Sequence, residues 1–173
     1  LARVDVNLGN INEIITDSSA QRVYVSGSMS ARLRVHDGIT LAERTEVSLT
    51  APISAARNTD GLLLLTLVSG DVVRFDPNTG AEQYRFTTDL PSVGGPMIRD
   101  MSVSRTNRLI ALAGQAASGK GNSPQEQRTL VYDTQTNSLI RVIYREGLDV
   151  VGVTINPSET FITMGFAGQP QIR

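Results

Sequence analysis

The chain has 173 residues, 40% of them hydrophobic, which is long enough for one domain with a sizeable buried core. Its 16 basic and 17 acidic residues leave a net charge of -1 without forming a basic stripe, so we expect no nucleic-acid partner. Cysteine is absent, which excludes disulfides and thiol catalysis, and no apolar run approaches the roughly 18 residues of a membrane-spanning helix, so we expect no membrane partner.

Short apolar runs bounded by polar turns follow one another along the chain, and none has the spacing of an amphipathic helix. This pattern predicts an all-β fold in which four-stranded antiparallel sheets repeat as the blades of a β-propeller. We expect a segment of about four blades from a larger propeller, because the chain starts without a methionine and its last blade stops early. The predicted parts are the end of a preceding blade (1–10), a blade (11–49), a second blade (52–87), a third blade with an inserted loop at 115–127 (98–146), and an incomplete blade (150–173).

The clearest repeat is an aspartate that ends a strand and begins a turn, at Asp37, Asp76 and Asp133. The first two are about 40 residues apart, which is the length of one four-stranded blade. An aspartate in this place accepts hydrogen bonds from the backbone N–H groups of the turn, so we interpret the three as turn residues and not as metal ligands or catalytic carboxylates. The residues expected to adopt the left-handed conformation that closes each turn are Gly38, Gly80 and Asn137.

Two insertions lengthen the chain between Asp76 and Asp133, at 87–97 and 115–127. Insertions of this kind extend from the surface of a propeller and leave the blade itself intact, so they are the predicted places of partner specificity. The predicted interaction residues in these loops are Asp89, Ser92, Gln115, Ser118, Lys120, Asn122, Gln125 and Glu126.

Two features resemble chemical sites but are better explained as structure. Segment 114–120 matches the G-x-x-x-x-G-K pattern of a phosphate-binding loop, yet Gly121 follows where Ser or Thr is needed, and a strand is predicted where a helix must begin. His36 is the only histidine, and it aligns with Phe75 and Tyr132 at a semi-buried strand position. We therefore predict no catalytic, cofactor-binding or metal-binding residues, no cofactor and no enzymatic activity.

At the level of four strands the chain resembles the WD-repeat class of β-propellers, with Phe75-Asp76 and Tyr132-Asp133 in place of the Trp-Asp dipeptide. It has no tryptophan, and no Gly-His pair opens a blade, so the YVTN and quinoprotein-like propellers remain alternatives.

One blade, from Met101 to Gln115 and then Leu130 to Asp133, is similar to a blade of microtubule- and axoneme-associated WD-repeat proteins, such as the EMAP-like proteins and ciliary propellers. This resemblance implies a cytoplasmic scaffold of the cilium or cytoskeleton. Its implied partners are other proteins in a multi-subunit complex.

Three functions are compatible with this repeat. A non-enzymatic scaffold that presents loops to partner proteins fits best, because the motifs contain no convergent set of acid and base groups. The alternative is an enzymatic propeller of the lactonase or quinoprotein kind with a central-channel site, for which the inner strands supply mainly Asn12, Glu13, Asp100 and Asn156. The open edge of the incomplete blade could also pair with a neighbouring chain by strand addition.

Overall fold

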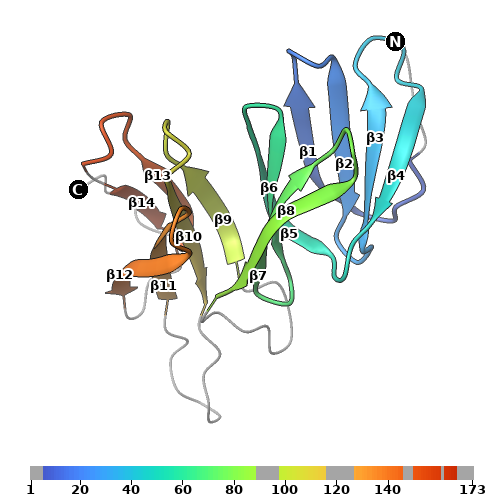
Figure 1. The fold of residues 1–173 in the computed structure, drawn as a ribbon. Helices are drawn as coiled ribbons and strands as arrows, with labels where there is room; N and C mark the ends of the chain where they lie inside the picture. The colour runs from blue at the N-terminus through green and yellow to red at the C-terminus, as the bar shows by residue number, and fades with distance from the viewer. Residues whose placement is uncertain (1–5, 89–97, 116–126, 146–149, 161, 167–173) are drawn as a thin grey trace. The chain divides into compact units, whose positions relative to one another are not determined.

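The computed structural model describes residues 6–88, 98–115, 127–145, 150–160 and 162–166, and these contain only strands and the turns and short links between them (Figure 1). The described strands form three four-stranded antiparallel sheets and one two-stranded sheet, each built from strands that are consecutive in the sequence. The contacts between residues divide the chain into two units, 1–85 and 86–173. Among the described residues there is no helix of the length and apolarity needed to cross a membrane.

The first unit contains two blades whose strands lie in sequence order. They share one cluster of buried side chains, to which Leu33 and Val35 contribute from the first blade and Val73 and Phe75 from the second. The first strands of the two blades also contact each other. The strands are β1 (Ile11–Asp17), β2 (Arg22–Gly27), β3 (Arg32–Asp37) and β4 (Glu43–Ser48), followed by β5 (Ile53–Thr59), β6 (Leu62–Leu67), β7 (Asp71–Asp76) and β8 (Ala81–Thr87).

The second unit contains a third blade and a two-stranded sheet. Small side chains of the third blade, Ala111 and Ala113, pack against Val150, Val153 and Ile155 of the two-stranded sheet. The strands of the blade are β9 (Ile98–Val103), β10 (Leu109–Gln115), β11 (Gln127–Asp133) and β12 (Ser138–Arg145), and those of the two-stranded sheet are β13 (Val150–Ile155) and β14 (Ile162–Phe166).

Burial within the second blade decreases from the middle strands to the last strand. In β6, Leu63, Leu65 and Leu67 are at most 1% exposed, whereas β8 has no buried residue. A middle strand has a hydrogen-bonded neighbour on each side and side chains packed on both faces. Its sequence is therefore a nearly continuous run of apolar residues. This profile is typical of a blade in a β-propeller, in which the middle strands are the most buried. The predicted all-β architecture of four-stranded propeller blades is therefore confirmed.

The residue that closes each aspartate turn lies four positions after the aspartate. Gly80 and Asn137 have positive φ angles of 73° and 53°, as predicted, but in the first blade the left-handed residue is Leu41, with a φ of 61°. The prediction for Gly38 is therefore wrong. Gly38 is needed for a different reason: a Cβ atom there would lie 2.9 Å from the carbonyl carbon of Gln21, in the neighbouring turn.

Candidate functional site

The three repeated aspartates accept hydrogen bonds from their own turns. In Asp37 and Asp133, one carboxylate oxygen accepts from the backbone N–H groups two and three residues further on, at 2.8 to 3.3 Å. Asp76 accepts from the N–H two residues further on, at 2.8 Å. These turn N–H groups are the main reason that the pKa of each carboxyl lies below its usual value. The predicted turn role is confirmed, because the carboxylates are engaged within their own blades.

His36 is 3% exposed and lies on β3 opposite Val23. Its Nδ1 is 3.1 Å from the carbonyl oxygen of Leu41, so this nitrogen carries the proton in that contact, because a carbonyl oxygen can only accept. Phe75 and Tyr132 occupy the same register position on their own blades and are also buried. The predicted role of His36 as a structural occupant of the strand is confirmed.

Two of the polar side chains suggested for a central-channel site, Asn12 and Asp100, hold neighbouring strands together. The Asn12 amide donates to the carbonyl oxygen of Ile53 at 2.9 Å, which ties β1 to β5. Asp100 accepts from the backbone N–H of Val153 at 2.9 Å, which ties β9 to β13. The Oδ1 of Asn156 accepts from a backbone N–H in its own turn. In the described part of the chain, no group of three or more His, Cys, Asp or Glu residues is placed to hold a metal ion.

Most of the predicted interaction residues lie outside the described residues. Only Gln115 falls within a described strand, at the end of β10, where its backbone pairs with Gln127. The interaction role of the two loops therefore stays a prediction. The other predicted residues, all outside the described ranges, are Asp89, Ser92, Ser118, Lys120, Asn122, Gln125 and Glu126.

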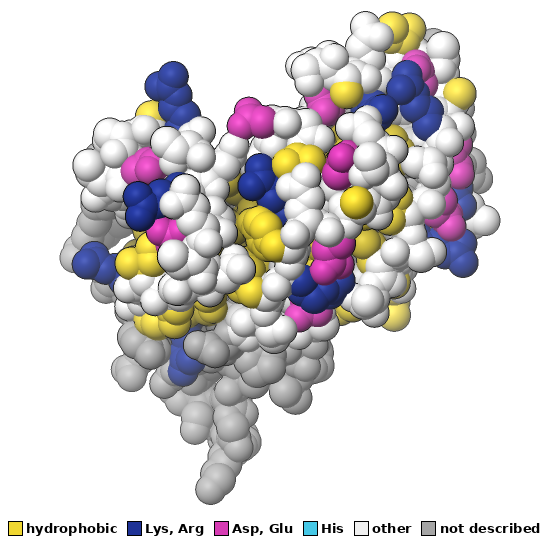
Figure 2. All heavy atoms as spheres, in the orientation of Figure 1, with side chains coloured by type: hydrophobic (Ala, Val, Ile, Leu, Met, Phe, Trp, Pro, Cys, Tyr) yellow, Lys and Arg dark blue, Asp and Glu magenta, His cyan; other side chains and the backbone are white. Residues whose placement is uncertain are grey.

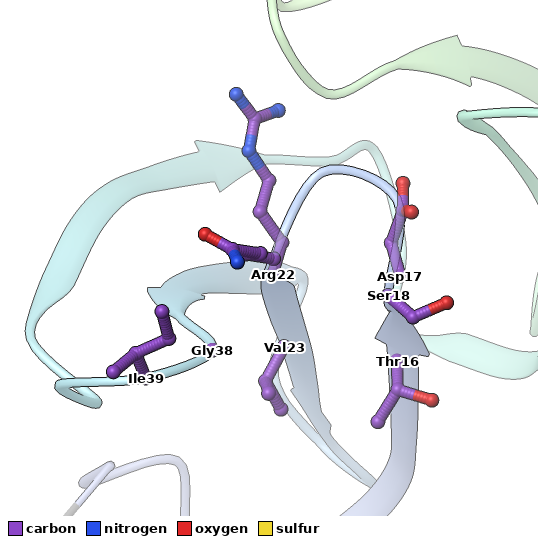
Figure 3. Close-up of a pocket in the computed structure, with 8 residues that line it drawn as sticks. Thr16, Asp17, Ser18, Arg22, Val23, Gly38 and Ile39 are labelled. Carbon is purple, nitrogen blue, oxygen red and sulfur yellow. The ribbon is translucent and has the colours of Figure 1, made fainter.

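A small cavity of about 210 Å³ lies beside the β1–β2 and β3–β4 turns (Figure 3). In Figure 3 the side chains of Asp17 and Arg22 extend in the opposite direction from those of Thr16 and Val23, so the charged and uncharged groups do not converge. One carboxylate oxygen of Asp17 accepts from the Ser19 hydroxyl at 2.6 Å, which is the main cause of its lowered pKa. This cavity therefore lacks the convergent groups of an active site.

A larger groove of about 440 Å³ lies in the second unit, between the third blade and the two-stranded sheet. Its lining is mainly apolar, with one basic and one acidic side chain at Arg141 and Glu159. Ile140, on β12, lines it and is 55% exposed. The other residues that line the groove are Leu109, Val131, Ile143, Ile155, Thr160 and Ile162.

The groove is lined in part by Ile162 of β14. Among the described strands, β14 pairs only with β13. Elsewhere hydrophobic and charged side chains are mixed, and Figure 2 shows no broad area of one charge on the face that it displays. This groove, which we call the β14 groove, is the candidate functional site. The sequence did not indicate which side chains would line it.

No protein-family model and no curated protein matches the sequence. Among solved structures, hydrazine synthase from Kuenenia stuttgartiensis, a β-propeller protein, matches 97% of this chain with a TM-score of 0.71 and 16% sequence identity. The chain spans 46% of the length of that chain. At this identity the similarity supports the propeller fold alone.

Proposed function

We propose that this chain is a non-enzymatic β-propeller module that binds other proteins. The observation that supports the proposal is the β14 groove, whose lining is mainly apolar. Protein segments bind to such grooves by burying apolar side chains. A small polar substrate would instead need several convergent polar groups, which the groove does not offer.

The hydrogen bonds of the inner strands also favour binding over catalysis. Asn12 and Asp100 would be natural ligands in a central channel, but both are engaged with the backbone of the next sheet. Moving either side chain to a ligand would leave a backbone group without its partner. A purified protein that retained stoichiometric calcium would instead favour the enzymatic alternative, and elemental analysis measures this directly.

The setting of the proposed binding follows from the sequence resemblance. If the similarity to microtubule-associated WD-repeat proteins holds, the partners are cytoplasmic proteins of the cilium or cytoskeleton, within a multi-subunit complex. Cosedimentation of the purified protein with microtubules tests this. The inserted loops would add specificity, so removal of residues 116–126 is expected to weaken partner binding while circular dichroism stays unchanged.

Site-specific photo-cross-linking tests whether the groove is the binding surface. A benzophenone amino acid replaces Ile140 in the groove, or Met29, which is 91% exposed and lies in the first unit, as the matched control. We expect discrete protein adducts from position 140 in cell extract and not from position 29. Adducts that form equally from both positions, or from neither, would contradict the proposal.

A further inference from the structure

The sequence contains two Asp-Gly pairs, Asp37-Gly38 and Asp60-Gly61. Among the bonds that follow an aspartate, the Asp-Gly bond rearranges most readily. The reason is that glycine has no Cβ to hinder the approach of its backbone nitrogen to the aspartate carboxyl. The fold places the two pairs in different surroundings, and those surroundings decide which pair is open to this reaction.

The Asp37-Gly38 pair is held on both sides of its peptide bond. One carboxylate oxygen of Asp37 accepts from two N–H groups of its own turn, at 2.8 and 2.9 Å, and the other pairs with Arg44. The turn N–H groups and Arg44 hold the pKa of Asp37 well below its usual range, so the protonated carboxyl, which is the form that reacts, is scarce at neutral pH. The Gly38 N–H donates to the backbone carbonyl oxygen of Gln21 at 2.7 Å, and backbone atoms of that turn crowd Gly38.

The Asp60-Gly61 pair has open space around it. It forms the two-residue loop between β5 and β6, where Thr59 and Leu62 face each other across the hairpin. Asp60 and Gly61 have φ angles of 53° and 81°, the left-handed conformation that closes a hairpin of this length. Asp60 is exposed, and a Cβ added at Gly61 would meet no atom within 4 Å. A ring can therefore form at this bond without displacing a neighbour.

The Gly61 N–H has a weaker partner than the Gly38 N–H. It donates to the side-chain oxygen of Asn58, in the same hairpin, at 3.2 Å. The Asn58 amide in turn donates to the carbonyl oxygen of Thr16 at 3.5 Å, which links this loop to the β1–β2 turn. A side-chain acceptor can rotate away from Gly61, whereas the acceptor of Gly38 is part of the backbone. The bond to Asn58 therefore restrains the Gly61 nitrogen without fixing it.

We propose that Asp60 is a modification site at which the chain isomerises spontaneously to isoaspartate. The backbone nitrogen of Gly61 attacks Cγ of Asp60 and closes a five-membered succinimide ring, while the proton of the nitrogen and the hydroxyl of the carboxyl leave as water. A water molecule then adds to the main-chain carbonyl carbon of Asp60, and the bond from that carbon to the nitrogen breaks. The chain now runs through Cγ, the former main-chain carbonyl becomes the free carboxyl, and no atom is gained or lost.

Isomerisation is expected to loosen the end of the β5–β6 hairpin. It adds one carbon to the main chain between Thr59 and Leu62, so the loop no longer has the geometry of a two-residue turn. It also moves the Gly61 N–H relative to Asn58, and the loop loses one of the bonds that hold it. The modification thus acts on the second blade and does not depend on the β14 groove.

Mass spectrometry of stored protein measures the reaction at both Asp-Gly pairs. The folded protein is kept at neutral pH and then digested, and electron-transfer fragmentation distinguishes isoaspartate from aspartate in each peptide. We expect isoaspartate to accumulate at Asp60 at least about 10-fold faster than at Asp37. In protein unfolded in guanidinium chloride the two rates should agree within about threefold, because the restraints on Asp37 are then lost.

Three variants locate the reaction. Asp60→Glu should abolish the product at this position, because the longer side chain must close a six-membered ring, which forms far more slowly. Asn58→Ala removes the acceptor of the Gly61 N–H and should raise the rate by about 2- to 10-fold, the equivalent of one hydrogen bond. Asn78→Ala, in an exposed turn of the same blade, is the matched control and should leave the rate at Asp60 unchanged.

The comparison within the unchanged protein decides the proposal. Equal accumulation at Asp60 and Asp37 in the folded state would overturn it, and so would product at Asp60 that forms only after unfolding. The isomerised protein can be separated by ion-exchange chromatography. Its amides should exchange faster in β5 and β6 than those of the unchanged protein, and at the same rate in β9.

Discussion

The hydrogen bonds between β9 and β13 allow a direct test of how the inner strands are held. The Ser102 hydroxyl accepts from the backbone N–H of Ile155 at 3.0 Å, next to the equivalent bond from Val153 to Asp100. Ile155 is only 7% exposed, so its N–H has little access to water once the hydroxyl is removed. The substitution Ser102→Ala deletes this acceptor and changes little else.

The expected loss follows from the buried donor that remains. Leaving a buried N–H without an acceptor costs about 1 to 3 kcal/mol. Ser102 itself is partly exposed, so some water can approach, and we expect the lower half of this range, about 1 to 2 kcal/mol. In urea unfolding this corresponds to a fall in the midpoint of about 0.5 to 1.5 M.

The control uses the same substitution in an exposed turn. The Ser138 hydroxyl donates to the carbonyl oxygen of Thr136, where water can replace it, so Ser138→Ala should change the unfolding free energy by less than about 0.5 kcal/mol. Hydrogen exchange should be faster in β13 of the Ser102 variant and unchanged in β5. Equal stability of the two variants would refute the view that side chains tie these inner strands together.

Three further predictions concern the turns and the core. Turn N–H groups lower the pKa of Asp37, Asp76 and Asp133, so their stabilisation is present above the unfolded value of about 3.9 and is lost as pH falls through the folded values. Circular dichroism should therefore show acid unfolding that begins below about pH 4. Gly38→Ala should destabilise by about 1 to 3 kcal/mol in thermal unfolding, because the new Cβ meets backbone. Leu65→Ala, at 0% exposure, should lose about 2 to 5 kcal/mol in urea unfolding.

The acid-unfolding prediction and the Leu65 prediction each have a control variant in the same protein. Asp133→Asn should flatten the acid dependence, because the side chain no longer titrates. Ile39→Ala, at a 70% exposed site, should change stability by less than about 0.5 kcal/mol, in contrast to Leu65→Ala. Acid unfolding centred near pH 6, or a Gly38 variant as stable as the unchanged chain, would contradict the reasoning on the turns.

The turns could be predicted from sequence because their interactions are local. An aspartate and the N–H groups two or three residues later are close in any strand-ending turn, so one residue type indicates the bond. The left-handed residue was harder to predict. Position four after the aspartate holds Gly80 and Asn137, which favour this conformation, but it holds Leu41 in the first blade, where the turn imposes it.

The candidate site could not be predicted in the same way, because it depends on contacts between distant segments. Asn12 and Asp100 look like ligands in the sequence, and only the approach of the next sheet shows that backbone groups engage them. In the sequence, Val131 and Ile143 look like any other apolar strand residues. They become candidates only because the structure places both of them in the lining of one groove.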